Sequence, residues 1–276
     1  MVKPVVSIIV PCYNQGQYLD AALQSVVEQT YQDWEAIIVN DGSLDHTEEV
    51  AFQWVNKDKR FIYYANENQG LVKTRNFAIS KAKGKYILPL DSDNQLINDF
   101  IESAVNAFVQ NKKIGVVHGD AIFFGLKEGY WKVPQYNYEK MLVDNIIDSC
   151  AIYKKSLWEA VGGYDVNLPH NGLEDWEFWI ALGNLNTVFH HLNKVTFKYF
   201  VAPNSMIKNF TDDMAMDTRN YLVRKYFKQY RAHYEKLYHE NRELKGILKN
   251  KKFIINLVVK KISGFTIFKS KGNNYL

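Results

Sequence analysis

The chain has 276 residues, 47% of them hydrophobic and 14% aromatic, which is enough for one sizeable core with an appendage. The net charge of +4 is unevenly spread, because residues 249–276 carry seven lysines and no acidic residue, leaving 27 basic and 30 acidic side chains in residues 1–248. This balance argues against a broadly basic nucleic-acid-binding face, and two cysteines, Cys12 and Cys150, are too few for a disulfide framework.

Short runs of β-branched and aliphatic residues in the first ninety positions are typical of strands buried on both faces, as in a parallel sheet. Helix-like stretches alternate with them, and the order βαβαβαβ predicts a doubly wound α/β layer. The expected strands include Val5–Val10, Ala36–Val39 and Tyr86–Leu90, and the expected helices are Tyr18–Gln29, Thr47–Asn56 and Leu71–Ala82.

Each expected strand ends in polar residues, and the ligand crevice of such a layer lies beyond the carboxyl ends of its strands. We therefore expect four polar segments to share one edge of the sheet. They are Cys12–Asn14, Asn40–Ser43, Asn66–Gly70 and Asp91–Asp93.

The second half of the sequence continues the alternation less regularly. We interpret residues 125–145 as a loop region, followed near residue 162 by a Gly-Gly turn. The expected helices are Asn98–Gln110, Lys155–Val161 and Glu174–Leu185, and the expected strands are Ile114–Phe124, Asp148–Tyr153, Thr187–His191 and Val195–Val201.

Residues 218–250 are expected to form one long helix, because apolar residues recur there at alternating spacings of three and four. Asn241 falls within the stripe, where a lone polar residue can set register and oligomeric state. The stripe could pack on the main body or join two copies in a homodimer, and the sequence leaves both open. It consists of Phe227, Tyr230, Tyr234, Leu237, Asn241, Leu244 and Leu248.

Asp91 and Asp93 are candidate metal ligands, because residues i and i+2 of an extended segment point to the same side. Two such carboxylates can hold Mg²⁺ or Mn²⁺ against a diphosphate. A solvated turn with Asx hydrogen bonds is the structural alternative, and it is the commoner origin of an isolated D-x-D.

The chain resembles the inverting glycosyltransferases of family two, which have the GT-A fold, from about Val5 to Ala202. The motifs that carry the resemblance are VSIIVPCYNQGQYLDAALQSVVEQTYQDWEAIIVNDGSLDHT, NQGLVKTRNFAISKAKGKYILPLDSDN, VGGYD and GLEDWEFW. Where the family usually has another acidic residue after its metal-binding cluster, this chain has Asn94.

The resemblance implies a GT-A type doubly wound mixed sheet flanked by helices, with a C-terminal helical extension. Residues 1–210 would be the glycosyltransferase domain, with a nucleotide-binding half at 1–95 and an acceptor-side half at 96–210. A long amphipathic helix at 211–250 and a basic, apolar tail at 251–276 would follow.

The resemblance also implies the donor site. Its ligand would be a nucleotide sugar, with a UDP-sugar expected first, and Mn²⁺ or Mg²⁺ would be held by Asp93 and Asp91. A tyrosine offers a stacking face to the base, and a carboxylate could accept the ring N–H of uracil; core packing and an Asx turn are the structural alternatives. The implied nucleotide-sugar-binding residues are Pro11, Tyr13, Asn14, Asp41, Arg75, Asp91 and Ser92.

Inverting transfer needs one base to take the proton of the acceptor hydroxyl, and the resemblance points to Asp175 with Glu174 beside it. Both acids could instead only complement a helix dipole. Trp176 and Gly163 are expected on the acceptor side, where Trp176 could also be a core residue. His190 and His191 could reach the metal, although a structural role is favoured for them.

The tail alternates lysines with apolar residues, as in Phe253–Val259, which suits a helix lying on an anionic membrane surface. Packing on the body or disorder is the alternative. We expect a cytoplasmic protein that acts on a glycan or lipid-linked acceptor, and the tail would make it peripheral on the inner face of the membrane.

Two other functions stay open at this point. A scaffold that binds a nucleotide sugar without catalysis, acting through the C-terminal helix, has Asn94 as its only support. A nucleotidyltransferase would be expected to have a Gly-rich, basic loop after its first strand, and residues 12–16 contain no basic side chain.

Overall fold

The computed structural model describes residues 3–202, 210–249, 251, 252 and 255. It divides into two compact units, Met1–Tyr221 and Leu222–Leu276. The first unit contains the sheet and every residue of the candidate site, so the two units are described separately.

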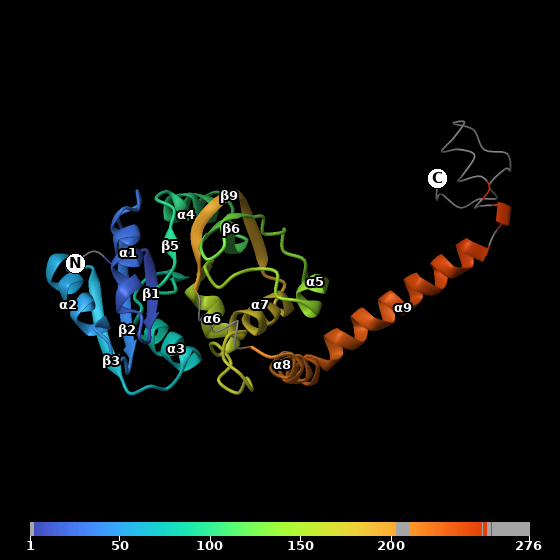
Figure 1. Ribbon diagram of the computed structural model, residues 1–276. Coiled ribbons are helices and arrows are strands. Elements are labelled where there is room, and N and C mark those ends of the chain that lie inside the picture. The colour runs from blue at the N-terminus through green and yellow to red at the C-terminus, as the bar shows by residue number, and fades with distance from the viewer. Residues whose placement is uncertain (1–2, 203–209, 250, 253–254, 256–276) are drawn as a thin grey trace. The chain divides into compact units, whose positions relative to one another are not determined.

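One half of the sheet is parallel (Figure 1), with strands in the order β3-β2-β1-β4. Its strands are buried runs of aliphatic residues, as the sequence predicts, and the expected βαβαβαβ order of the first ninety residues is confirmed. Their bounds are β1 Val6–Cys12, β2 Trp34–Asp41, β3 Phe61–Asn66 and β4 Tyr86–Pro89.

The other half is mixed, because β8 pairs antiparallel to β4 and β6 antiparallel to β8, whereas β9 runs parallel to β6. Two sequence expectations are wrong here. The region expected to be loop contains β7 and helix α5 (Tyr138–Val143), and two expected strands are one strand, β9. The bounds are β5 Gln95–Leu96, β6 Ile114–Gly125, β7 Gly129–Trp131, β8 Ile152–Lys154 and β9 Val188–Val201.

β9 remains one strand because the irregularity at Asn193 is confined to a few residues. Asn193 adopts a positive φ of 53°, and its backbone N–H donates to His191 Nδ1 at 2.9 Å. The register between β6 and β9 shifts at His118–Ala121, and pairing resumes on both sides of the shift.

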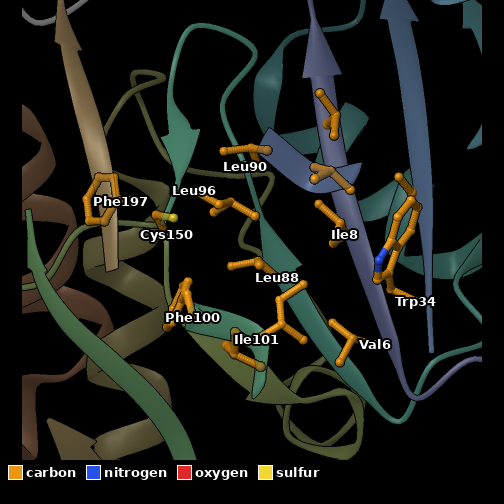
Figure 2. Close-up of a cluster of buried hydrophobic side chains, with 14 of the residues drawn as sticks. Val6, Ile8, Trp34, Leu88, Leu90, Leu96, Phe100, Ile101, Cys150 and Phe197 are labelled. Carbon is orange, nitrogen blue, oxygen red and sulfur yellow. The ribbon is translucent and has the colours of Figure 1, made fainter. Parts of the chain in front are cut away.

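Helices cover both faces of the parallel strands. Side chains of α1, α2 and α4 share one buried cluster with Val6 and Ile8 of β1 and Leu88 of β4, part of which Figure 2 shows. Ile9 and Ile37 alternate to the other face, are also fully buried, and lie on the strands that α3 contacts. The helix bounds are α1 Gly16–Val27, α2 Thr47–Lys57, α3 Leu71–Lys81, α4 Phe100–Gln110, α6 Lys155–Val161 and α7 Glu174–Asn184.

The expected long helix is divided into α8 (Asp212–Lys225) and α9 (Phe227–Lys249). The division is a turn at buried Tyr226, whose N–H still donates to the Leu222 carbonyl. The exposed apolar residues of α9 include Phe227, Tyr234 and Leu237. Among the residues that the structure describes, no helix is long and apolar enough to cross a membrane; most of the tail, 256–276 included, lies outside them.

Candidate active site

The loops after β1, β2 and β3 meet at one edge of the sheet, as the sequence predicts. The Asn14 N–H donates to Ser43 Oγ at 2.9 Å, and Asn14 Oδ1 accepts the Leu44 N–H at 2.8 Å. The oxygens of Asp41 accept the N–H groups of Gln69 and Gly70 at 3.0 and 2.9 Å. These bonds build the expected nucleotide side from three strand ends.

The residues implied in nucleotide binding differ in what they leave accessible. The Tyr13 side chain is 49% exposed and could offer its ring to a base. Pro11 and Asp41 are buried, and the Asp41 carboxylate already holds the 69–70 backbone. The contact predicted between Asp41 and a ring N–H would have to use its remaining lone pairs.

Arg75 of α3 lies at the centre of the site and is 2% exposed. One of its terminal nitrogens pairs with Glu174 at the start of α7, and the other pairs with Asp91 after β4 and approaches Ser149 Oγ at 3.3 Å. Burial lowers the pKa of Arg75, but these two carboxylates raise it well above its ordinary value. Arg75 therefore bridges the carboxylates of Asp91 and Glu174, and its contact with the base or diphosphate stays a prediction.

Carboxylates outnumber cations around Arg75. Burial, reinforced by the charges of Asp91 and Asp148, raises the pKa of Asp93 to about 7. Burial and the charge of Asp91 likewise raise the pKa of Asp148 to about 7. A site whose carboxylates repel one another in this way favours an added positive charge.

The residues present fit a divalent cation held jointly with a diphosphate. Among the described residues no group of three or more His, Cys, Asp or Glu side chains has the geometry of a complete metal site. Mg²⁺, however, is usually bound through one or two carboxylates plus substrate phosphates. Asp93 and Asp91 are hard oxygen donors of the right kind, whereas the Ser92 side chain is buried.

Asp175 lies in the first turn of α7, beside Glu174. Its Oδ1 accepts the Trp176 N–H at 2.8 Å, and its Oδ2 accepts from Asn145 Nδ2 at 3.0 Å. Burial, with the charges of Glu174 and Asp148, raises the pKa of Asp175. The carboxylate is thus fixed at both oxygens and has raised basicity, as a general base requires.

The two acceptor-side residues have structural roles in this chain. Trp176 is 2% exposed and its indole N–H donates to the Met141 carbonyl, so it is a core residue rather than the wall of an open pocket. Gly163 has a φ of +91°, and a Cβ there would lie 2.9 Å from Asn76 Oδ1. That position favours glycine for the turn itself.

Three residues near the site were missed or misjudged from the sequence. Asn145 ends the irregular segment 125–145, Asp148 follows it, and neither belongs to a recognisable motif, so no local signal marks them. Asn94 stands where the family usually has another acidic residue. Its side chain is 2% exposed and accepts the Phe200 N–H at 2.9 Å, which ties the segment after β4 to β9.

The histidine pair has no contact with the carboxylates around Arg75 among the bonds that the structure gives. His191 is buried and its Nε2 lies 3.0 Å from Asp120 Oδ1, whereas His190 is exposed. The structural role that the sequence favoured for them agrees with this arrangement.

The family follows from comparison with known proteins. The model of glycosyl transferase family 2 matches residues 7–161, more than half of the chain. The chain belongs to glycosyl transferase family 2. Among curated relatives, the chondroitin synthase of Pasteurella multocida is 30% identical over 216 residues, which cover 75% of this chain and 22% of that protein. The chain thus spans about a fifth of that relative's length.

Solved structures support the fold. Staphylococcus aureus TarS in complex with UDP-GlcNAc has a TM-score of 0.64 at 20% identity, covering 77% of this chain and 64% of that one. The mannosyltransferase PcManGT from Pyrobaculum calidifontis, in complex with GDP-Man and Mn²⁺, has a TM-score of 0.59 at 18% identity over 74% and 59% of the two chains. The expected mixed GT-A sheet with a C-terminal helical extension is confirmed.

Proposed function

We propose that the chain transfers a sugar from a nucleotide-diphosphate sugar to a hydroxyl group of a glycan or lipid-linked acceptor, with inversion at the anomeric carbon. The observation that carries this proposal is the position of Arg75, which joins Asp91 on the donor side to Glu174 beside the candidate base. A site that only bound a nucleotide would not need Glu174 and Asp175 in addition to Asp91 and Asp93.

On the donor side, Asp93 and Asp91 would hold Mn²⁺ or Mg²⁺. When bound, such an ion supplies positive charge that stabilises the departing nucleoside diphosphate. Tyr13 would stack on the base. A UDP-sugar is the first donor to test because TarS, a neighbour in fold, has been solved with UDP and with UDP-GlcNAc.

On the acceptor side, Asp175 would take the proton of the attacking hydroxyl while the hydroxyl oxygen bonds to the anomeric carbon. The bond from that carbon to the diphosphate oxygen breaks in the same step, so no covalent enzyme intermediate is needed. The raised pKa of Asp175 supports this role, because a more basic carboxylate accepts a proton more readily. Glu174, whose charge is paired with Arg75, would orient the acceptor and would not transfer a proton.

The non-catalytic scaffold is not favoured. Its only sequence support is Asn94, and the hydrogen bond from the Phe200 N–H gives that residue a structural purpose. Complementing the helix dipole would explain an acidic residue at the start of α7, but it would not require the second hydrogen bond to Asp175, from Asn145 Nδ2.

We also propose that the enzyme works at the cytoplasmic face of a membrane through its lysine-rich tail. The support is the charge pattern of residues 249–276. Co-sedimentation with anionic liposomes would compare the full chain with one that ends at Asn250. Equal partitioning of the two proteins would contradict the proposal.

Pairing of two copies through residues 218–250 is a further proposal, supported by the apolar stripe of α9. Leu237 and Leu244 are 47% and 58% exposed. Sedimentation equilibrium of the full chain should give a dimer, and replacing both leucines with glutamate should give a monomer. A wild-type monomer at high protein concentration would contradict it.

The function itself is tested with donors before any acceptor is known. Thermal unfolding with Mn²⁺ would be measured against UDP-GlcNAc, UDP-glucose, UDP-galactose, UDP-glucuronate and GDP-mannose, because a ligand of the folded state raises the melting temperature. Release of UDP or GDP then reports turnover. A protein that neither binds nor consumes any of the five would contradict the proposed function.

A further inference from the structure

The segment that follows α5 is clamped onto the helix that carries the candidate base. The indole N–H of Trp176 donates to the Met141 carbonyl, and that of Trp179 donates to the Ile147 carbonyl at 3.1 Å. Both tryptophans belong to α7 and are at most 2% exposed. Residues 141 and 147 are therefore fixed on either side of Asn145.

The clamp brings the Asn145 amide against Asp175. Asn145 Nδ2 donates to Asp175 Oδ2 at 3.0 Å, while Asn145 Oδ1 is buried and accepts no hydrogen bond from any residue that the structure describes. Turning the amide over would replace this N–H donor with an oxygen, which cannot donate to the ionised carboxylate. The observed orientation thus presents the NH₂ group to Asp175.

We propose that Asn145 is a positioning residue for the base: its amide fixes the Asp175 carboxylate for proton abstraction and stabilises its ionised form. The proposal rests on the proposed function, because it takes Asp175 as the base. Asn145 lies outside the four motifs that identify the family, so it adds a residue that they do not assign.

The charged and titratable groups around Asp175 set the direction of the expected effect. Glu174 on the same helix and Asp148 ahead of β8 raise the pKa of Asp175, whereas Arg75 of α3 and the Asn145 amide lower it. The pKa values of Tyr164 and of Tyr199 in β9 are raised mainly by burial, and the charge of Asp175 adds to this shift. Loss of the amide donor should therefore raise the pKa of Asp175.

Carboxyl-¹³C NMR titration of the full chain measures that pKa without substrate, with Asp175→Asn identifying the resonance. In Asn145→Leu, which has a similar shape and no donor, the pKa should rise by roughly one pH unit, the usual effect of a hydrogen bond to a charged group. In Asn145→Asp, which adds a negative charge, it should rise further. The matched control is Asn137→Ala, which removes the side-chain cap of α5 and does not touch Asp175.

An unchanged Asp175 titration in Asn145→Leu, or an equal rise in Asn137→Ala, would overturn the proposal; if Asn145→Leu does not fold, Asn145→Asp decides. Failure of the proposed function is a separate result, because it appears as absent donor turnover. Where turnover is found, the acidic limb of the kcat/KM profile should move to higher pH in Asn145→Leu. If Asn145→Leu kept the wild-type kcat/KM and pH profile while Asp175→Asn was inactive, only the proposed role of Asn145 would be overturned.

Discussion

Two of the buried polar clusters in the unit Met1–Tyr221 are satisfied in different ways. In the first, between β6 and β9, the Asp120 carboxylate accepts from the Tyr130 hydroxyl, from the Val133 N–H at 2.9 Å and from His191 Nε2 at 3.0 Å. His191 Nδ1 accepts a backbone N–H, so Nε2 carries the hydrogen. The second cluster surrounds Arg75, where one guanidinium faces several carboxylates.

The comparison separates a structural cluster from one arranged for a ligand. The β6–β9 cluster supplies Asp120 with three donors from the chain itself, and nothing further is required of it. The cluster around Arg75 leaves the pKa values of Asp93 and Asp148 raised, so its negative charge is not balanced from within. Unbalanced buried charge is tolerated where a bound ion or substrate compensates it.

The largest expected effect is on catalysis. Asp175→Asn should lower the turnover number by about 10²–10⁴-fold, the usual contribution of a general base, without loss of stability, because it removes a repelled charge. Asp120→Asn, in the other cluster, should lower the melting temperature and leave turnover of the folded protein unchanged. Initial rates of UDP release and thermal unfolding check both. Full activity in Asp175→Asn would mean that the base is wrongly assigned.

The next effect is on stability. Arg75→Met should lower the free energy of unfolding by about 3–5 kcal/mol, because it leaves the buried Glu174 carboxylate, and the partly exposed Asp91, without their cation. Arg60→Met is the matched control. It should cost at most about 1 kcal/mol, because Arg60 pairs with Asp58 near the surface, at 2.7 Å. Urea unfolding measures both variants. Equal losses would show that Arg75 does not neutralise its site.

Much of the fold was predictable, because the strands of the parallel half are runs of aliphatic residues with polar ends. The failures have local causes. β9 looked like two strands because Asn193 interrupts the apolar pattern, yet pairing with β6 carries the strand through. The helix over 218–250 looked continuous because a turn at Tyr226 leaves the apolar spacing unchanged.

The places of Asp91, Asp93 and Asp175 were predictable, because a motif fixes each at the end of β4 or the start of α7, whereas their roles stay predictions. The role of Arg75 was not, since its partners lie 16 and 99 residues away in the sequence. Asn145 and Asp148 were invisible for the same reason. They reach the site only through the packing of the segment after α5 and the short strand β8.

A smaller effect is expected at His118, a member of the β6–β9 cluster that is not satisfied as Asp120 is. Both ring nitrogens of His118 are buried without a hydrogen bond from the residues described, and burial lowers the pKa of His118 to about 3. The unfolded chain, with a histidine pKa of about 6.5, binds the proton first, so His118 costs stability as the pH falls below that value. His118→Phe, which keeps a flat ring beside His191, should escape this loss.

Relative to the wild type, the free energy of unfolding of His118→Phe should gain about 2 kcal/mol between pH 7.5 and pH 5. Urea unfolding at several pH values measures the difference. His190→Phe, at an exposed position of β9, is the matched control and should show no such trend. Parallel pH curves for wild type and His118→Phe would mean that His118 is not held neutral.

The smallest effect distinguishes the two clusters by their response to a cation. Because burial and neighbouring charges disfavour the Asp93 carboxylate, Asp93→Asn in metal-free buffer should raise the melting temperature by a few degrees, the shift expected for about 1 kcal/mol. Mn²⁺ with a nucleoside diphosphate should raise the melting temperature of the wild type. The same addition should not raise the melting temperature of Asp93→Asn. In Asp120→Asn, by contrast, the stabilisation by Mn²⁺ should persist. If Mn²⁺ stabilised Asp93→Asn as strongly as the wild type, the excess charge around Arg75 would have a purpose other than holding a cation.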